Sequence, residues 1–389
     1  MKVSVVISAR NEFPNIVHTV HSILNDLETF LQPNDYEILI VDNCSDDSDP
    51  RHRAISGTVD FLRSRGMYSN RVLKIIYDPI AGNVSARNKG VAVAQGEYVF
   101  FSDAHMSYGI GTFKRLMQTI DESGGIVHPA VAWMGSYPPS KGYQYSWKLG
   151  EEFKGTWNNY LVGKGDDWFY VPAMGHCCLG MKREQFLKFR GYPDFLRCYG
   201  GGEVFLDSKW WMMGSSVVTE PRVSVYHLSA SRGYSYVHDD YIHNVFHSAL
   251  VLGADAWAER TYLNYLRKNR KEVLDRMWKE AWKEAQPQRD FLMENSVMRF
   301  DDMLVRRPWD EMNMKKFGGS NSGMLIYHWT ELELLKQSST AKVAYLESKL
   351  QQGLGEFIEK NLSGNVYRHN ESIKRLGLNN LIQLRKTLL

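Results

Sequence analysis

The stretch that decides the fold covers residues 96–105 and reads Gly96-Glu97-Tyr98-Val99-Phe100-Phe101-Ser102-Asp103-Ala104-His105. Its aromatic and β-branched centre predicts a buried strand, and open α/β sheets bind ligands at the carboxyl ends of their strands. Asp103 and His105, just past this end, can both turn toward one ion, and a carboxylate with a neutral imidazole suits Mn²⁺. Alone, the common pattern Asp-X-His favours a solvated turn with an incidental histidine. The rest of the chain reverses that preference.

The bulk composition indicates a folded chain with a sizeable core. The 389 residues are enough for two domains, or for one large domain with an appendage. Hydrophobic residues make up 43% and aromatic residues 13%, which argues against wholesale disorder. The formal net charge of +3 is too small to indicate a nucleic-acid-binding protein by itself.

Cysteine usage and the N-terminus predict a cytoplasmic location. The four cysteines show no zinc-like spacing, and the adjacent pair Cys177 and Cys178 is a poor arrangement for a structural disulfide, which indicates a reducing compartment. Residues 1–7 lead straight into a strand without a signal-peptide core, and no segment is apolar for long enough to cross a membrane. We therefore expect a cytoplasmic protein, in the host cytoplasm if the chain is phage-encoded.

Strands and helices are predicted to alternate over the first hundred residues. Residues 3–7, 37–41 and 72–77 read as strands, and helices are expected after Pro14 and from about residue 82. This order predicts an α/β fold with a mostly parallel sheet flanked by helices on both faces. No Walker or dinucleotide-binding fingerprint follows the first strand, which disfavours those two classes of nucleotide site.

Polar residues at the strand ends predict a nucleotide site. Asp42 and Asp103 end two strands and are expected at one edge of the sheet, where Asp42 can accept a hydrogen bond from a uracil imide or a ribose hydroxyl. The positive charge of Arg87 can pair with a phosphate or with a polar edge of the base. For Asp46 and Asp47 we favour a simpler role in capping a turn.

Three segments, residues 5–12, 40–47 and 86–90, resemble the nucleotide-binding half of family 2 glycosyltransferases of the GT-A fold. Asp103-Ala104-His105 is a variant of that superfamily's Asp-X-Asp motif, and its His-ended form resembles the polypeptide N-acetylgalactosaminyltransferases. In that family the Asp and His bind Mn²⁺, which holds the sugar-nucleotide diphosphate. The resemblance implies a UDP-sugar donor and these donor-binding residues: Ala9, Arg10, Asn11, Glu12, Asp42, Arg87, Asp103 and Ala104.

The acceptor half carries matching pieces. Residues 172–183 fit a small-residue strand followed by a helix, and Gly201-Gly202-Glu203 resembles the Gly-Gly-Glu of the same relatives. Glycines let the backbone come close to a ligand, and the helix start behind them places a carboxylate at the sugar. His227 ends a later strand, at the place where the relatives carry their third metal ligand. The alternative interpretation of His227 is an ordinary surface or core histidine. Asp103, His105 and His227, with two diphosphate oxygens and a water, would complete an octahedral site for Mn²⁺ or Mg²⁺.

The predicted chemistry is metal-dependent glycosyl transfer to a hydroxyl group. An inverting enzyme needs a carboxylate base, for which Glu203 is the first candidate and Asp207, which can alternatively face solvent on its helix, the second. Inverting relatives carry an Asp directly after that Glu, whereas this chain has Val204, so we favour retention. In retaining relatives Glu203 would orient sugar or acceptor, while the leaving diphosphate helps to deprotonate the attacking hydroxyl.

The acceptor stays open at this stage. The family's polypeptide acceptor is not carried over, and a bacterial or phage enzyme of this kind can glycosylate a surface-polysaccharide precursor, a protein, or a hydroxymethylated base in DNA. Abundant Trp and Tyr suit stacking on sugars or bases. The alternatives are a non-catalytic carbohydrate- or nucleic-acid-binding protein, and a nucleotidyltransferase, for which residues 9–12 are a poor phosphate-gripping signature.

We expect residues 1–235 to form the catalytic domain, divided into a nucleotide-sugar half (1–107) and an acceptor half (108–235). Residues 232–236 are a candidate loop for closing over the donor. Residues 236–389 read as mainly helical, interrupted at 318–323, and are expected to grip the acceptor, to form a homodimer, or to do both. The His and Asp residues of 238–247 invite a second-metal interpretation, but we favour a helix that packs on the catalytic domain.

Overall fold

We analysed a computed structural model of the chain, which describes residues 1–46, 64, 72–134, 143–149, 153, 155–159, 161–162, 165–228, 234–266 and 269–317. Several predicted features lie outside these residues: Asp47, the first two residues of the 232–236 loop, the break at 318–323 and the helical segment 325–389. Among the helices that are described, none combines the length and apolar character needed to cross a bilayer.

A parallel sheet forms the N-terminal half, as the alternation predicts. β1 (Val3–Ala9) lies between β2 (Tyr36–Asn43) and β4 (Tyr98–Asp103), and β3 (Leu73–Asp78) completes the edge beyond β2; all four strands run in the same direction. Helices α1 (Asn15–Leu27) and α3 (Asn83–Val93) make the crossovers. Buried runs of Val, Ile and Phe in these strands are typical of a sheet that is covered on both faces.

The second half extends the same sheet with mixed directions. Strand β10 (Cys178–Lys182) pairs antiparallel with β4 and with β6 (Ile126–Trp133), and β11 (Val217–His227) pairs parallel with β6. Antiparallel β5 (Met106–Tyr108) and β9 (Phe169–Tyr170) join β11, so that six of the nine strands in this sheet share one direction. A separate hairpin is formed by β7 (Ser146–Leu149) and β8 (Gly155–Asn158). The fold class is the predicted one.

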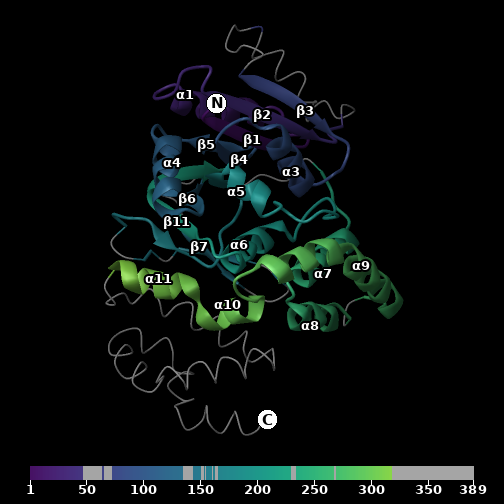
Figure 1. Cartoon of the computed structure of the whole chain (residues 1–389). Coiled ribbons are helices and arrows are strands. Elements are labelled where there is room, and N and C mark those ends of the chain that lie inside the picture. Colours follow the sequence, from purple (N-terminus) through teal and green to yellow (C-terminus); the bar gives the residue numbers. More distant parts are fainter. Residues whose placement is uncertain are drawn as a thin grey trace.

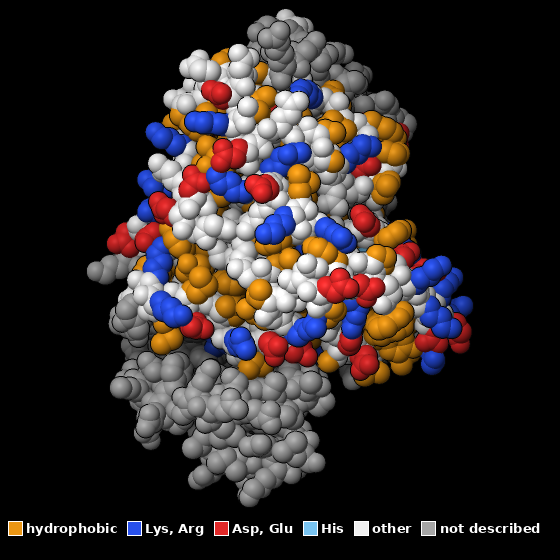
Figure 2. Space-filling model, viewed as in Figure 1, with side chains coloured by type: hydrophobic (Ala, Val, Ile, Leu, Met, Phe, Trp, Pro, Cys, Tyr) orange, Lys and Arg blue, Asp and Glu red, His pale blue; other side chains and the backbone are white. Residues whose placement is uncertain are grey.

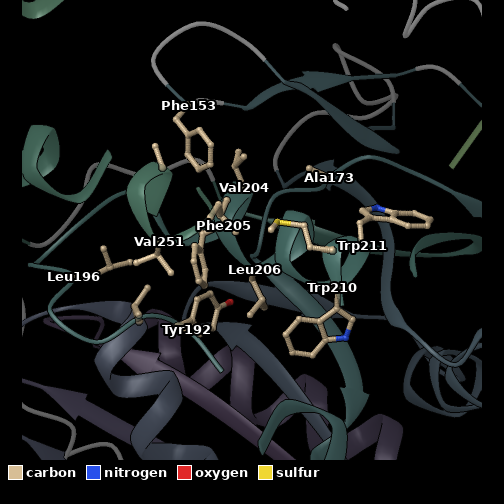
Figure 3. Close-up of a cluster of buried hydrophobic side chains, with 14 of the residues drawn as sticks. Phe153, Ala173, Tyr192, Leu196, Val204, Phe205, Leu206, Trp210, Trp211 and Val251 are labelled. Atoms are coloured by element: carbon tan, nitrogen blue, oxygen red, sulfur yellow. The ribbon is translucent and has the colours of Figure 1, made fainter. Parts of the chain in front are cut away.

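Two hydrophobic cores lie on the two faces of the sheet. Along β1, Val5 and Ile7 point into one core with α1 and α4 (Thr112–Ser123), whereas Val6 points into the other. That second core contains α3, α5 (Arg183–Lys188) and α6 (Gly202–Met212), and it continues without a break into the C-terminal helices (Figures 1 and 3). These helices are α7 (His238–Val251), α8 (Asp255–Leu266), α9 (Lys271–Asn295), α10 (Phe300–Arg306) and α11 (Pro308–Phe317).

Candidate active site

An open cavity of about 350 Å³ lies at the carboxyl ends of β1 and β4. Of the residues expected to bind donor, metal or acceptor, nine line it: Ala9, Arg10, Glu12, Arg87, Asp103, Ala104, His105, Glu203 and His227. Asn11, Asp42 and Asp207 do not line it. The segments come from positions more than 200 residues apart in the chain, and the sheet topology brings them to one edge.

Asp103, His105 and His227 form a group that we call the metal triad. β5 and β11 pair so that His227 lies opposite Met106, next to His105 in the chain, and the Leu228 N–H donates to the His105 carbonyl oxygen at 3.0 Å. One ligand atom from each member lies within 4.8 Å of the others, and His227 Nε2 is 3.5 Å from Asp103 Oδ2. One carboxylate oxygen and two imidazole nitrogens on a cavity wall fit a divalent transition metal.

His227 and Arg87 together hold Asp103 in its charged form. The Arg87 guanidinium is 2% exposed and donates from one terminal nitrogen to Asp103 Oδ1 at 3.1 Å. Burial alone would raise the pKa of Asp103, but the hydrogen bond from His227 and the charges of Arg87 and His105 outweigh it and hold the pKa well below its usual range. Asp103 is therefore a carboxylate at any physiological pH.

Glu12 fixes the orientation of His105. Its Oε2 lies 3.0 Å from His105 Nδ1, and since a carboxylate only accepts, the proton of this hydrogen bond belongs to Nδ1. The lone pair of a neutral His105 ring is then on Nε2. Histidines that bind metals are commonly oriented by a carboxylate in this way.

Arg10, Asn11 and Asp42 connect the loops after β1 and β2. Asp42 is the register partner of Ala9, and its Oδ1 accepts the Ser45 N–H at 3.1 Å. Asn11 accepts the Asp46 N–H and donates its own N–H to the Ser45 hydroxyl oxygen. The Arg10 guanidinium packs over the ring of Tyr234, 5.0 Å from its centroid. These contacts hold the two loops together beside Arg10 and Tyr234, which line the cavity.

Glu203 stands in the first turn of α6, two residues after the N-cap Gly201, whose φ of 83° is the left-handed conformation that glycine favours. Burial raises the pKa of Glu203 to about 7, and the charge of Asp103 adds to this, while Arg87 opposes it. The carboxyl can therefore take up or release a proton near neutral pH. Val204, the next residue, points into the hydrophobic core (Figure 3).

Asp207 is fully buried, so the alternative that it faces solvent is wrong. One oxygen accepts the Met174 N–H at 2.8 Å, and the other lies 3.1 Å from His176 Nε2 and 3.5 Å from His128 Nε2. Burial would raise the pKa of Asp207, but the two histidines lower it to about 2. Asp207 is an ionised anchor inside the protein.

Sequence reasoning missed one wall of the cavity. Trp133, Trp147 and Trp157 lie there in edge-to-face contact, with ring centroids 5.4–5.9 Å apart, and Trp133 also contacts the His227 ring at 5.3 Å. Gly175 makes room for them, because a Cβ at that position would lie 2.5 Å from Trp157. The high Trp content was the only signal in the sequence, and it does not say which tryptophans meet.

Two of the three histidines of α7 are packed inside the protein, as expected. His243 and His247 are buried, and His243 Nε2 lies 2.7 Å from Glu284 of α9. Within the described residues, two groups of at least three His, Cys, Asp or Glu side chains lie close enough to share an ion, namely the metal triad and His128 with His176 and Asp207. Neither group includes a residue of α7.

The comparisons with known proteins agree with this geometry. Residues 4–186 match the family model described as Glycosyl transferase family 2. The N-terminal part of the chain is thus similar to this family. A putative polypeptide N-acetylgalactosaminyltransferase 13 from Drosophila melanogaster is 24% identical over 296 residues, 66% of this chain and 48% of that protein. A probable N-acetylgalactosaminyltransferase 9 from Caenorhabditis elegans is 26% identical over 239 residues, which cover 58% of this chain and 39% of that protein.

The GT-A fold of the chain is also found in a solved structure. The crystal structure of GalNAc-T7 with UDP, GalNAc and Mn²⁺ superposes with a TM-score of 0.58 at 17% identity, over 74% of this chain and 55% of that one. The chain spans less than half the length of the two curated relatives above. The similarity therefore supports the family and the fold, and leaves the activity to be inferred from the site.

Proposed function

We propose that the chain transfers a sugar from a UDP-sugar to a hydroxyl group of an acceptor, with the metal triad holding Mn²⁺ or Mg²⁺. The observation that carries the proposal is the convergence of the triad, the buried Arg87 and the carboxyl of Glu203 on one cavity. The similarity to proteins named as N-acetylgalactosaminyltransferases, and to a structure that contains UDP and Mn²⁺, supports the donor class.

The residues around the triad suit the departure of a nucleotide diphosphate. A bound divalent cation supplies Lewis-acid stabilisation of the negative charge on the leaving diphosphate. Arg87 holds the metal-ligand carboxylate of Asp103 ionised, and Glu12 holds the His105 ring. Arg10, beside Ala9 and Ala104 in the cavity wall, adds a positive charge for the nucleotide. Asn11 and Asp42 hold the loops on which these residues stand.

Glu203 is assigned to the reacting centre. Its position on the cavity wall lets it orient the transferred sugar or the acceptor hydroxyl, and its raised pKa lets it exchange a proton near neutral pH. We favour retention of configuration because position 204 is a buried valine and not an acid. Asp207 has no access to the cavity, so we assign it a supporting role.

The tryptophan wall, formed by Trp133, Trp147 and Trp157, offers a surface on which the acceptor can bind. Three indole rings beside the metal triad present apolar faces against which a sugar or a base ring can pack. A surface-polysaccharide precursor, a protein and a hydroxymethylated base in DNA stay candidate acceptors. On the face shown in Figure 2, Lys and Arg are interspersed with Asp and Glu, so this face offers no continuous basic track for DNA.

The test is hydrolysis of a panel of UDP- and GDP-sugars, with and without Mn²⁺. We expect slow, Mn²⁺-dependent release of UDP from one UDP-sugar, because water can replace the acceptor. Asp103→Ala and His227→Ala should abolish the Mn²⁺ dependence while the circular dichroism spectrum stays native. Failure of the wild-type chain to hydrolyse or bind any donor would favour a non-catalytic binding protein, and Mn²⁺ dependence that survives in either variant would refute the triad.

A further inference from the structure

Four buried side chains form a continuous hydrogen-bonded series behind the metal triad, which we call the buried relay: Arg87, Tyr192, His176 and Asp207. The Arg87 guanidinium lies 3.2 Å from the Tyr192 hydroxyl, which lies 2.8 Å from His176 Nδ1, and His176 Nε2 lies 3.1 Å from Asp207 Oδ1. Each member is at most 2% exposed. Figure 3 shows the Tyr192 side chain in the hydrophobic cluster beside α6.

The chemistry of the groups fixes the direction of every proton in the relay. Arginine can only donate, so the Tyr192 oxygen accepts from Arg87. The single Tyr192 proton is then directed at His176 Nδ1, which must be the accepting nitrogen. His176 therefore carries its proton on Nε2 and donates it to the Asp207 carboxylate. Burial lowers the pKa of His176 to about 4, consistent with a neutral ring.

The relay fixes the orientation of the Asp103 carboxylate through Arg87. A second terminal nitrogen of Arg87 donates to the His176 carbonyl oxygen at 2.6 Å and to Asp103 Oδ1 at 3.1 Å. With Oδ1 held by Arg87, the other oxygen, Oδ2, is the one directed toward His227 Nε2, at 3.5 Å. A carboxylate held in this way presents one defined oxygen to the triad.

We propose that His176 is a positioning residue that acts through Tyr192 and Arg87 to present Asp103 Oδ2 to the cation of the metal triad. This inference rests on the proposed function, because it assumes that the triad binds a divalent metal. It also gives Asp207 a role: by accepting the Nε2 proton it selects the tautomer of His176 that leaves Nδ1 free to accept from Tyr192. Partners beyond the direct ligands commonly change metal affinity by about 10–100-fold.

The relay also accounts for the second group of possible ligands. His128, His176 and Asp207 lie close enough to share an ion. Both ring nitrogens of His176 are already engaged, however, with Tyr192 and with Asp207. A cation there would take the Nε2 lone pair and place the His176 proton on Nδ1, against the Tyr192 proton. The relay and a second metal site therefore exclude each other.

The experiment measures Mn²⁺ affinity of the full chain in the presence of saturating UDP, by calorimetry and by the electron paramagnetic resonance signal of free Mn²⁺. Tyr192→Phe removes only the relay hydroxyl, and we expect Mn²⁺ to bind about tenfold more weakly. The matched control is Tyr36→Phe, because Tyr36 is equally buried and its hydroxyl bonds to Glu28, away from the cavity. The control should bind Mn²⁺ as the wild type does.

A pair of substitutions at His176 separates the relay from a general packing defect. Asparagine can place an acceptor near the position of Nδ1, whereas glutamine can place a donor near Nε2. His176→Asn should therefore retain more Mn²⁺ affinity than His176→Gln, although asparagine is the smaller side chain and leaves more of the histidine's volume unfilled. Equal losses in the two variants, or unchanged affinity in Tyr192→Phe, would overturn the relay.

The outcomes distinguish the two proposals. If the wild-type chain binds no Mn²⁺ in the presence of UDP, the proposed metal site itself fails, and the relay fails with it. If the wild type binds Mn²⁺ but Tyr192→Phe binds it equally well, the relay alone fails. Elemental analysis that finds a second metal per chain, lost in a His128→Ala variant, would also overturn the relay.

Discussion

The carboxyl of Glu203 combines two demands on a single residue. The proposed role at the reacting centre requires a place on the cavity wall, which Glu203 has, and desolvation near Asp103 raises its pKa to about 7. The folded state therefore keeps the Glu203 proton between its ordinary pKa of 4.5 and about 7, while the unfolded state releases it. Stability is lost as the pH rises through this window.

Glu203→Gln should thus separate stability from activity. Above pH 7, in the presence of a chelator, the variant should be more stable than the wild type by about 1–3 kcal/mol, because no charge has to be buried. Thermal unfolding at pH 5 and pH 8 checks this: the difference in stability between the variant and the wild type should shrink at the lower pH.

The Glu203→Gln variant should still bind UDP with Mn²⁺ but transfer sugar at least about 100-fold more slowly. Weakened donor binding with normal turnover would instead assign Glu203 a structural role.

Glu12 offers a second residue-scale prediction. Glu12→Gln keeps the size of the side chain but removes the charge that holds the Nδ1 proton of His105. We expect Mn²⁺ to bind about tenfold more weakly, measured by calorimetry with UDP present. Glu97→Gln is a suitable control, since Glu97 is exposed and pairs with Lys182 outside the cavity. Equal affinity of Glu12→Gln and wild type would show that Glu12 does not support the metal ligand.

Helix α7 determines the path of the loop that leads to Glu203. The Asn244 amide accepts the Arg197 N–H at 2.8 Å and donates to the carbonyl oxygens of Arg197 and Tyr199. A Cβ on Gly201 would lie 2.8 Å from the Asn244 carbonyl oxygen, so the glycine is required for this close approach. The C-terminal helices thus take part in building the site, beyond any contact with acceptor or partner.

Asn244→Ala tests this arrangement at the scale of an element. The variant should lose about 1–3 kcal/mol of stability through unsatisfied backbone groups, and its kcat should fall as the loop before Glu203 loosens. Asn313 is the matched control, because it is equally buried and bonds in the same two-way manner to the backbone of Tyr170, away from the cavity. Asn313→Ala should lose similar stability with unchanged kcat; an equal fall of kcat in both variants would contradict the assignment.

Local patterns made the strands and the triad candidates predictable. Runs of Val, Ile and Phe that stop at Asp42 and Asp103 are continuous in sequence, and the start of α6 is marked by consecutive glycines. The relay was not predictable in this way. Its members Arg87, Tyr192, His176 and Asp207 come from α3, the loop after α5, the loop before β10 and the middle of α6, and only the tertiary fold brings them together. The sequence around each of these residues does not indicate that they contact one another in the fold.

At the scale of the whole molecule, the boundary expected at residue 235 crosses a continuous core. Phe205 of α6 belongs to the same buried cluster as Phe246 of α7, Trp257 of α8 and Leu274 of α9. Each large apolar side chain that is fully buried contributes about 1.5–3 kcal/mol. Removing α7–α10 would expose one side of this cluster, so we expect these helices to be needed for the stability of the sheet and of α6.

We therefore predict that a fragment of residues 1–235 does not fold stably, although it contains every predicted donor, metal and catalytic residue. The measurement is thermal unfolding of the full chain and the fragment, followed by near-ultraviolet circular dichroism. The full chain should lose its tertiary signal in a single cooperative transition shared by the sheet and helices α7–α10, because one core serves both. The fragment should lack that signal or aggregate. A fragment that unfolds cooperatively and binds Mn²⁺ with UDP would show that the two parts are independent domains, and the loop before Glu203 would then hold its shape without Asn244.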